Sequence, residues 1–410
     1  MANIKPFSAL RPAAELAAQV ASLPYDVMNR QEAKSLAVGN PSSFLHITRS
    51  EIDLPDDVDA HTPVVYNKAK ENLTAFMSRK ILFQENKACY YIYQLTMHGR
   101  SQTGLVAVSS LADYDNNIIK KHEFTRPEKE LDRINHMATI GAQTGNVFLA
   151  YKNIAAIDNI ISKWQSEKSP VYDFTSPDNI RHAIWVINDD ATIQLITHIF
   201  SAQVPSTYIA DGHHRAASAA KVRDLLKNDN EAAQYFLTTL FPSNQLQIMD
   251  YNRVVKDLNG LSTEQFLKEL QEKFEVELIG QQSYRPAQLH EFGMYFDKNW
   301  YKLSARSGSY ASDLISILDV SILQNNILDQ LLDIKDPRTD KRIDFVGGIR
   351  GLEELEKRVN SGEMKVAFSL FPVSIEQLFA IADSGSVMPP KSTWFEPKLR
   401  DGLLTHIIHH

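Results

Sequence analysis

One short stretch near the middle of the chain limits the possible folds most. Within twenty residues its composition changes from apolar to polar, and then to rich in alanine. Tyr208–Ala210 is apolar and favours a short strand. The polar run Asp211–Arg215 follows, and Gly212 within it permits a backbone geometry that other residues avoid. Ala216–Lys227 is rich in alanine and leucine, which is typical of a helix. The stretch therefore predicts a strand, a sharp turn, and a helix whose small side chains let it lie close to a sheet.

The predicted turn carries groups that suit a phosphate. Free backbone N–H groups at a helix N-terminus attract anions, and His213, His214 and Arg215 add two imidazoles and a guanidinium. Asp211 would repel phosphate unless a metal ion or a proton lies between, and Mg²⁺ held by one carboxylate and substrate phosphates is a common solution. We therefore expect Gly212, His213, His214, Arg215 and Ser218 to bind a phosphorylated cofactor, with Asp211 as the metal ligand. The plain alternative is a solvated polar loop.

Composition limits the class of protein. The chain has 410 residues and a net charge of −7, so we expect two domains, or one with large insertions, and no nucleic acid partner. Cys89 is the only cysteine, which excludes an intrachain disulfide and a cysteine-based zinc cluster. The sequence contains neither an apolar signal core near its start nor a run of about 18 apolar residues. We expect a cytoplasmic protein without a membrane partner, and its oligomeric state stays open.

The pattern of apolar residues predicts an α+β protein in two regions. We expect 1–260 to hold the phosphate site, and 261–410 to form a second α+β unit that returns a loop, 388–398, toward that site. The predicted helices are Ala13–Ala21, Arg30–Ala37 with Asn29 as its cap, Tyr66–Arg79, one within Asp158–Asp178, Ser262–Phe274 with Ser262 as its cap, Asp319–Asp333, Gly351–Ser361 and Ser374–Gly385. The predicted strands are Ser43–Thr48, Cys89–Met97, Thr103–Ser109, Asn146–Tyr151, His182–Ile187, Phe236–Phe241, Leu246–Asn252, Val276–Ile279, His290–Tyr295, Trp300–Leu303, Asp344–Val346 and Val366–Leu370.

Seven segments along the chain carry a family resemblance. They are LPYDVMNR at Leu23–Arg30, GNPSSFLHITRSEIDLP at Gly39–Pro55, KKHEFTRPEKELDRINH at Lys120–His136, ADGHHRAASAA at Ala210–Ala220, MDYNRVVKDLNGL at Met249–Leu261, DPRTDKRIDFVGG at Asp336–Gly348 and MPPKSTWFEPKLRDGL at Met388–Leu403. On these segments the chain is identified as a member of the domain of unknown function 1015 family. The Asp211–Arg215 run also resembles the phosphate-binding signature of the ParB/sulfiredoxin-like superfamily, and is similar to the Gly-His-His-Arg turn of free serine kinases.

The resemblance implies a mixed-sheet core of the ParB/sulfiredoxin-like kind with large insertions. It also implies a kinase that transfers phosphate from ATP or ADP, with Mg²⁺, to the hydroxyl of free serine or a related metabolite. Asp211, His213 and His214 would act at the phosphate. Neither a P-loop nor a protein-kinase glycine-rich loop is present, so the turn itself would hold the nucleotide.

A hydroxyl acceptor needs a carboxylate base within hydrogen-bond reach. Glu123 is the first candidate, and Asp211 and Asp26 are alternatives. The pair His122-Glu123 does not begin a zinc-protease motif, because Arg126 stands where that motif needs a second histidine.

Two further segments carry candidate ligand contacts. His46, Thr48 and Arg49 are candidates for the carboxylate of an amino-acid acceptor, although polar residues at a strand edge would look the same. Lys391 follows Pro389-Pro390 in a stiffened loop, which would order over a cofactor or serve as a tie between domains.

Two other functions stay open: a ParB-like nucleotide switch or nucleotide hydrolase that phosphorylates no metabolite, and a ligand-binding protein without catalysis. The acceptor and the choice between ATP and ADP are not fixed by the residues. His409 and His410 are native or the remnant of a purification tag, and they receive no role.

Overall fold

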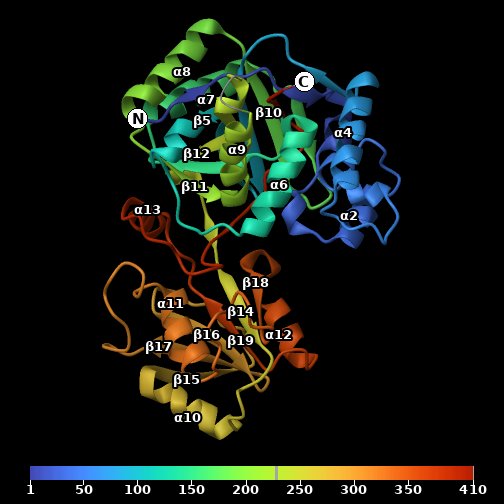
Figure 1. Ribbon diagram of the computed structural model, residues 1–410. Coiled ribbons are helices and arrows are strands. Elements are labelled where there is room, and N and C mark those ends of the chain that lie inside the picture. The colour runs from blue at the N-terminus through green and yellow to red at the C-terminus, as the bar shows by residue number, and fades with distance from the viewer. Residues whose placement is uncertain (227–229, 410) are drawn as a thin grey trace. The chain divides into compact units, whose positions relative to one another are not determined.

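The computed structural model describes residues 1–226 and 230–409, which form two compact units (Figure 1). Unit 1 comprises Met1–Leu246 and Pro397–His410, and unit 2 comprises Gln247–Glu396. Unit 2 is therefore continuous in the sequence, whereas unit 1 is completed by a segment that follows unit 2. The sequence predicted two regions of different function, divided between residues 260 and 261. A division into compact units does not test a division by function, so this one stays a prediction.

Unit 1 is built on a nine-stranded mixed sheet. Its strands lie in the order β6-β11-β8-β12-β5-β4-β10-β9, and β1 also pairs with β5. Their bounds are β1 Ile4–Lys5, β4 Tyr90–Met97, β5 Arg100–Ser110, β6 Ile119–Lys120, β8 Val147–Tyr151, β9 Tyr172–Thr175, β10 Arg181–Ile187, β11 Thr207–Asp211 and β12 Tyr235–Pro242. The mixed sheet and the α+β class are as predicted.

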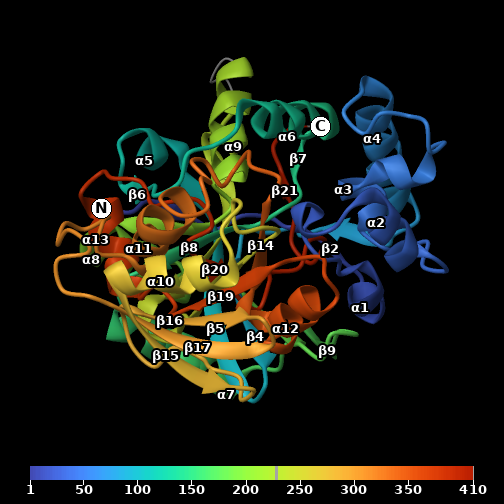
Figure 2. The same cartoon turned by 90° about the horizontal axis from the view of Figure 1, so that it is seen from below.

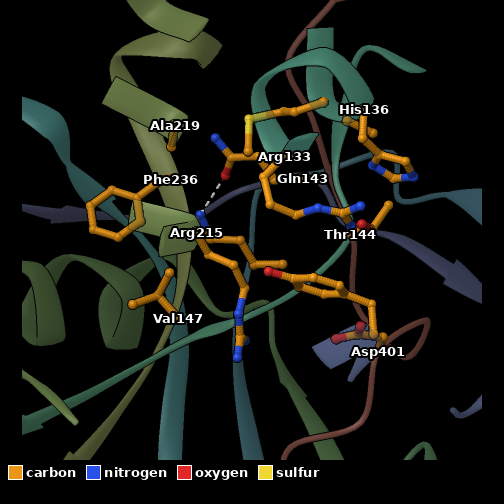
Figure 3. A pocket seen from close by; sticks show the side chains of 14 residues that line it. Arg133, His136, Gln143, Thr144, Val147, Arg215, Ala219, Phe236 and Asp401 are labelled. Carbon is orange, nitrogen blue, oxygen red and sulfur yellow. Dashed lines mark hydrogen bonds between the residues drawn. The ribbon is translucent and has the colours of Figure 1, made fainter. Parts of the chain in front are cut away.

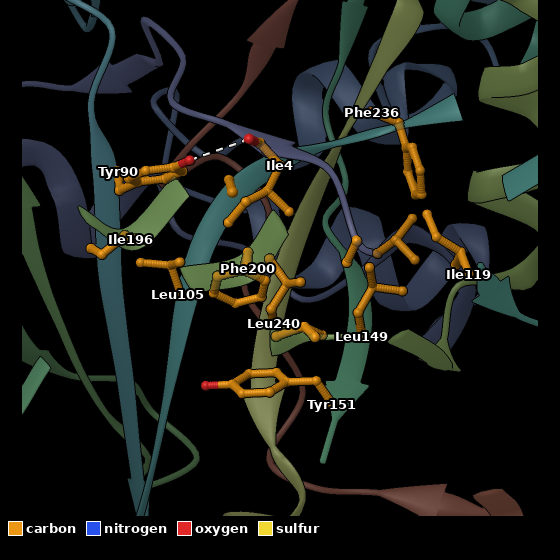
Figure 4. Close-up of a cluster of buried hydrophobic side chains, with 14 of the residues drawn as sticks. Ile4, Tyr90, Leu105, Ile119, Leu149, Tyr151, Ile196, Phe200, Phe236 and Leu240 are labelled. Atoms are coloured by element: carbon orange, nitrogen blue, oxygen red, sulfur yellow. Dashed lines mark hydrogen bonds between the residues drawn. The ribbon is translucent and has the colours of Figure 1, made fainter. Parts of the chain in front are cut away.

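Helices cover one face of this sheet through a large cluster of buried apolar side chains (Figure 4). The strands supply Leu105, Leu149 and Leu240, and α8 supplies Ile196 and Phe200 at helical spacing. Each such side chain contributes about 1.5–3 kcal/mol when fully buried. The helices of unit 1 are α1 Ala17–Val20, α2 Arg30–Ala37, α3 Leu45–Thr48, α4 Pro63–Ser78, α5 Leu111–Asp115, α6 Pro127–Ile140, α7 Ala155–Glu167, α8 Asp190–Gln203 and α9 His213–Leu225.

The predicted strand, turn and helix are β11, Gly212 and α9. β11 pairs with β8 in antiparallel fashion and with β6 in parallel fashion, and a bulge lies between Ile209 and Asp211. The alanines of α9 pack against the sheet and against α6, which runs beside it (Figures 1 and 2). The described part of this helix ends at Leu225, and Lys227, which the sequence placed in the helix, lies outside the described residues.

The N-terminal part of unit 1 confirms one local prediction and overturns another. Asn29 caps α2 in a reciprocal capping box with Glu32, as predicted. The strand predicted at Ser43–Thr48 is wrong, because Leu45–Thr48 forms the short helix α3. Phe44 and Ile47 are both fully buried in a cluster that α4 shares, and their spacing of three suits a helix rather than a strand.

The segment that follows unit 2 in the sequence pairs with strands of unit 1. Thr405 exchanges two backbone hydrogen bonds with Leu10, and β21 (His406–Ile407) pairs with β7 (Ala142–Gln143). Ile408 is buried in the main core cluster. Leu10 also begins β2 (Leu10–Pro12), which pairs with β3 (Leu82–Gln84).

Unit 2 has its own six-stranded sheet in the order β15-β17-β16-β19-β14-β18. Its strands are β14 Tyr251–Val255, β15 Phe274–Gly280, β16 Glu291–Phe296, β17 Asn299–Ala305, β18 Ile343–Gly347 and β19 Val366–Leu370, and a separate pair joins β13 Ile248–Met249 to β20 Trp394–Phe395. Its helices are α10 Thr263–Lys273, α11 Asp319–Leu323, α12 Glu353–Asn360 and α13 Ile375–Asp383. Ser262 and Ser374 cap α10 and α13 with capping boxes, and the former was predicted.

Several elements were not predicted, among them α8 and β9. In addition, the predicted helix Asp319–Asp333 is divided between α11 and a π-helix at Gln324–Asp329. Across residues 1–226 and 230–409, no helix combines the length and the apolar composition needed to cross a membrane.

Candidate functional site

The N-terminus of α9 is an uncapped helix end. Gly212 occupies the cap position in the left-handed region, with φ of 102°, and it has no side chain to accept from the first-turn N–H groups. A Cβ atom there would lie 3.3 Å from Arg215 Nε and 3.4 Å from Val147 Cα. Glycine is therefore required both by the backbone angle and by the close approach of Arg215. The turn leaves the N–H groups of His213, His214 and Arg215 available to an anion.

Arg215 is the electrostatic centre of the site. Its side chain is 10% exposed, and its guanidinium donates to the carbonyl oxygen of Asn146. Its Nη2 lies 3.7 Å from Asp211 Oδ1 and 3.9 Å from Asp26 Oδ2. Burial opposes the charge, but the carboxylates of Asp211 and Asp26 outweigh it and raise the pKa of Arg215. The guanidinium is therefore permanently charged and points into a ring of acidic groups.

Asp211 lies between two cations. Its Oδ2 is 3.2 Å from Lys398 Nζ, and its other oxygen faces Arg215. Burial alone would raise the pKa of Asp211, but the Lys398 ammonium and the Arg215 guanidinium hold it well below its usual range. Sequence reasoning missed Lys398 and chose Lys391 from the same segment. The sequence contained a signal for Lys398, because this residue belongs to Met388–Leu403, one of the segments that carry the family resemblance.

His213 and His214 hold the loop that precedes α6. His213 Nε2 accepts from the backbone N–H of His122 at 3.4 Å, and His214 Nε2 accepts from that of Arg126 at 2.9 Å. Each imidazole is therefore neutral, with its proton on Nδ1. Burial lowers the pKa of both side chains, and for His213 the neighbouring His122 ring adds to the effect.

Glu123 lies on the same loop. Its Oε2 is 3.6 Å from His213 Nδ1, the ring nitrogen that carries the proton, and its side chain is about half exposed. The structure thus places the first candidate base next to the helix N-terminus. The alternatives Asp26 and Asp211 lie on the other side of the turn, both next to Arg215.

The predicted acceptor residues lie in and after α3, where they make internal contacts. His46 Nδ1 is 2.8 Å from Asp53 Oδ1, and the buried Thr48 hydroxyl donates to the carbonyl of Phe44. Arg49 Nη1 donates to the carbonyl oxygens of Tyr25, at 2.8 Å, and Met28, at 2.6 Å. Arg49 therefore fixes the loop that carries Asp26.

Two other residues were predicted to bind the cofactor. Ser218 is fully buried on the side of α9 that faces α6, and its hydroxyl donates to the carbonyl of Glu130 at 3.2 Å. Lys391 belongs to unit 2, where its Nζ lies 5.5 Å from the centre of the Tyr251 ring. The role of each residue at the phosphate stays a prediction.

A small pocket of about 30 Å³, partly open to solvent, lies beside Arg215 (Figure 3). Arg133, His136, Gln143, Thr144 and Asp401 line it together with Arg215 (Figure 3). The Arg133 guanidinium stacks 3.9 Å from the centre of the Tyr25 ring, which also lines the pocket. Two guanidiniums and a buried carboxyl therefore face a space next to the helix N-terminus.

A comparison with protein families matches the chain over residues 4–321 to a family described as "protein of unknown function (DUF1015)". The chain belongs to this family. The membership predicted from the seven segments is thereby confirmed, and the wider ParB/sulfiredoxin-like resemblance stays a prediction. Lys398 and Asp401 lie outside the residues matched to DUF1015. No curated protein matches the chain.

Solved structures give weak matches. A free serine kinase variant in complex with AMP is 12% identical, with a TM-score of 0.37 over 73% of this chain and 91% of that one. A free serine kinase variant in complex with ADP is 13% identical, with a TM-score of 0.36 over 73% and 92%. A conserved hypothetical protein from Pyrococcus furiosus is 14% identical, with a TM-score of 0.35 over 73% and 94%. These scores are too low to carry an argument about this member of the DUF1015 family.

The side chains at this site do not fit a metal ion held by the protein alone. Among the described residues, no group of three or more His, Cys, Asp and Glu side chains is placed to bind one. Asp211, the predicted ligand, is already paired with Lys398 and Arg215. A cation would have to displace the lysine, so the site itself supplies at most one carboxylate.

The buried carboxyl of Asp401 should make the stability of the fold depend on pH. Burial raises the pKa of Asp401 to about 8, although Arg215 opposes the shift. The folded chain then keeps a proton that an unfolded aspartate, with a pKa of about 3.9, has lost. Stability from this group therefore falls as pH rises from about 4 to 8, by up to about 1.4 kcal/mol per pH unit.

We expect Asp401→Asn to flatten this part of the stability curve, because asparagine does not titrate. Denaturant unfolding at pH 5, 6, 7 and 8 should show the variant gaining stability relative to the unaltered chain as pH rises. Parallel curves for the two chains would contradict the proposed burial of a protonated carboxyl.

Proposed function

We propose that unit 1 is a small-molecule kinase of the kind the sequence predicted, transferring phosphate from ATP or ADP to the hydroxyl of free serine or a related metabolite. One observation carries the proposal: the uncapped N-terminus of α9 presents backbone N–H groups beside a buried, permanently charged Arg215. Phosphoryl transfer needs little more from a protein than positioning and charge neutralisation. This arrangement supplies both.

The nucleotide phosphates would bind over the first turn of α9. The N–H groups of His213 and His214 and the Arg215 guanidinium would hold the phosphate oxygens. Lys398 pairs with Asp211 at 3.2 Å and is within reach of the same turn, so it would exchange its carboxylate partner for a phosphate oxygen on binding. The histidine rings would keep the loop His122–Arg126 in place beside the nucleotide.

In the transfer step, the acceptor oxygen forms a bond to the terminal phosphorus while the bond from phosphorus to the nucleotide oxygen breaks. The hydroxyl proton passes to a carboxylate. Glu123 and Asp26 are the candidates that suit this role, since both side chains are partly exposed. Asp211 suits it less, because its low pKa makes it a weak base. The pocket lined by Arg133 and Asp401 would take the remainder of the acceptor.

Mg²⁺ belongs to this proposal only as an ion that the nucleotide phosphates carry. It would supply charge neutralisation at the phosphates, and Asp211 is a nearby carboxylate that would contact it if Lys398 moved away.

The activity is tested with the purified chain, Mg²⁺, ATP or ADP labelled in the terminal phosphate, and a panel of hydroxy amino acids and polyols. The proposal expects label in one acceptor. Nucleotide cleavage without any labelled acceptor would favour the alternative of a nucleotide hydrolase or switch. Nucleotide binding without cleavage or transfer would leave a binding protein, and failure to bind nucleotide would overturn the proposal.

The two candidate bases are separated by matched variants. We expect Glu123→Gln or Asp26→Asn, whichever removes the base, to lower kcat by about 10²–10⁴-fold while nucleotide affinity changes little. Asp173→Asn is the control, since this carboxylate forms a surface pair with Arg181. Retention of full activity in both variants would exclude both residues and return the role to Asp211.

A further inference from the structure

Unit 2 buries an arginine on a strand next to the edge of its sheet. Arg253 lies on β14, between β18 and β19, opposite Phe345 and Phe368. It is 4% exposed, and its guanidinium carbon lies 5.4 Å from the centre of the Phe345 ring. An arginine at such a place is unusual, because charged side chains are rarely buried without a partner of opposite charge.

The partners of Arg253 are all neutral. Its Nη1 donates to the carbonyl of Tyr251, and its Nη2 lies 3.0 Å from the Lys391 carbonyl and 3.5 Å from that of Pro390. The last distance is at the limit of a hydrogen bond. A guanidinium has five N–H donors, so three carbonyls leave part of its capacity unused.

Within residues 1–226 and 230–409, no carboxylate forms an ion pair with Arg253. Burial consequently lowers the pKa of Arg253 to about 10. Arg285, also in unit 2, shows the opposite arrangement, because its Nη1 lies 2.6 Å from the buried carboxylate of Asp250.

A second cation lies at the same place. Lys391 is exposed, and its Nζ is 5.5 Å from the centre of the Tyr251 ring. Its backbone has φ of 60°, a left-handed geometry that is uncommon for lysine. That geometry belongs to the turn whose carbonyls face Arg253. The Trp394 ring packs against the same Tyr251 ring, with centroids 4.9 Å apart.

We propose that Arg253 and Lys391 form a binding site in unit 2 for a small molecule that carries an oxyanion, either a phosphoryl group or a carboxylate. The anion would supply the negative charge that the sheet lacks, contacting Arg253 Nη2 and Lys391 Nζ, with Tyr251 and Trp394 beside it. The proposal concerns unit 2 alone and does not depend on the proposed kinase activity of unit 1.

The test uses the full chain labelled with 5-fluorotryptophan. The sequence has four tryptophans, so fluorine NMR gives four signals, and Trp394→Phe identifies the one that reports on this site. Sodium phosphate and sodium acetate are titrated separately at constant ionic strength, with chloride as the balance. We expect a saturable shift of the Trp394 signal with phosphate, acetate or both, and the comparison of the two identifies the preferred group.

Variants decide whether the two cations are responsible. Lys391→Ala and Arg253→Lys should each weaken the response about tenfold or more, because each removes or misplaces a charged donor. Lys268→Ala, which removes an exposed lysine from α10, should change nothing. The signal of the fully buried Trp300 reports that unit 2 stays folded. A Trp394 signal that responds to neither anion, or that responds equally in every variant or to chloride, would overturn the site.

Discussion

Arg215→Met should lower the free energy of unfolding of unit 1 by about 3–5 kcal/mol at pH 7, because removing one partner of a buried charge cluster leaves the others uncompensated. Asp211 and Asp26 both face this guanidinium, whose side chain is only 10% exposed. The loss should shrink as pH falls. The pKa of Asp211 is held low in the folded chain, so the stability it provides is present above its unfolded pKa and disappears as the carboxylate protonates.

Denaturant unfolding measures this effect, with Trp164 and Trp185 as fluorescent probes of unit 1. The matched control is Arg181→Met, whose guanidinium pairs with Asp173 on the surface, with side chains 49% and 39% exposed. That pair should contribute no more than about 1 kcal/mol. Equal losses for the two variants would show that the Arg215 cluster contributes no more than a surface ion pair.

Deleting residues 397–410 should abolish cooperative unfolding of unit 1. The deletion removes Leu399, Leu403, Leu404 and Ile408, which are all nearly fully buried. At about 1.5–3 kcal/mol for each side chain, the loss is about 6–12 kcal/mol, which equals the stability of a typical domain. It also removes Arg400, whose guanidinium contacts Asp178, Ser176 and His182.

Limited proteolysis and the four fluorotryptophan signals measure the result. Trp164 and Trp185 should lose their native signals, whereas Trp300 should keep its signal, because unit 2 retains its own sheet and core. A synthetic peptide of residues 397–410 added to the shortened chain should restore the unit 1 signals. A shortened chain that unfolds cooperatively without the peptide would contradict the prediction.

The local structure of the candidate site was predictable from its residues. Gly212 and the alanines of α9 act through backbone freedom and side-chain size, which are properties of neighbouring residues in the sequence. The caps at Asn29 and Ser262 were found for the same reason. The missed helix α8 also had a local signal, since Ile193, Ile196 and Phe200 repeat at helical spacing.

The strand predicted at Ser43–Thr48 is wrong, and Lys398 was missed, because distant segments decide both. The stretch Ser43–Thr48 contains residues that suit a strand, but α4 and its neighbours bury Phe44 and Ile47 and so select a helix. Lys391 and Lys398 stand seven positions apart in one segment, and both are plausible phosphate ligands from residue type alone. Only the return of the chain into unit 1 places Lys398 against Asp211.

The order of the units along the chain has a consequence for synthesis on the ribosome. A nascent polypeptide emerges from its N-terminal end, so unit 2, which is continuous, is available in full before unit 1 is. At about 5–20 residues per second, the 150 residues of 247–396 delay the closing segment by roughly 8–30 s. During that interval β7 lacks its partner strand β21, and a chaperone that shields β7 would raise the yield of native protein.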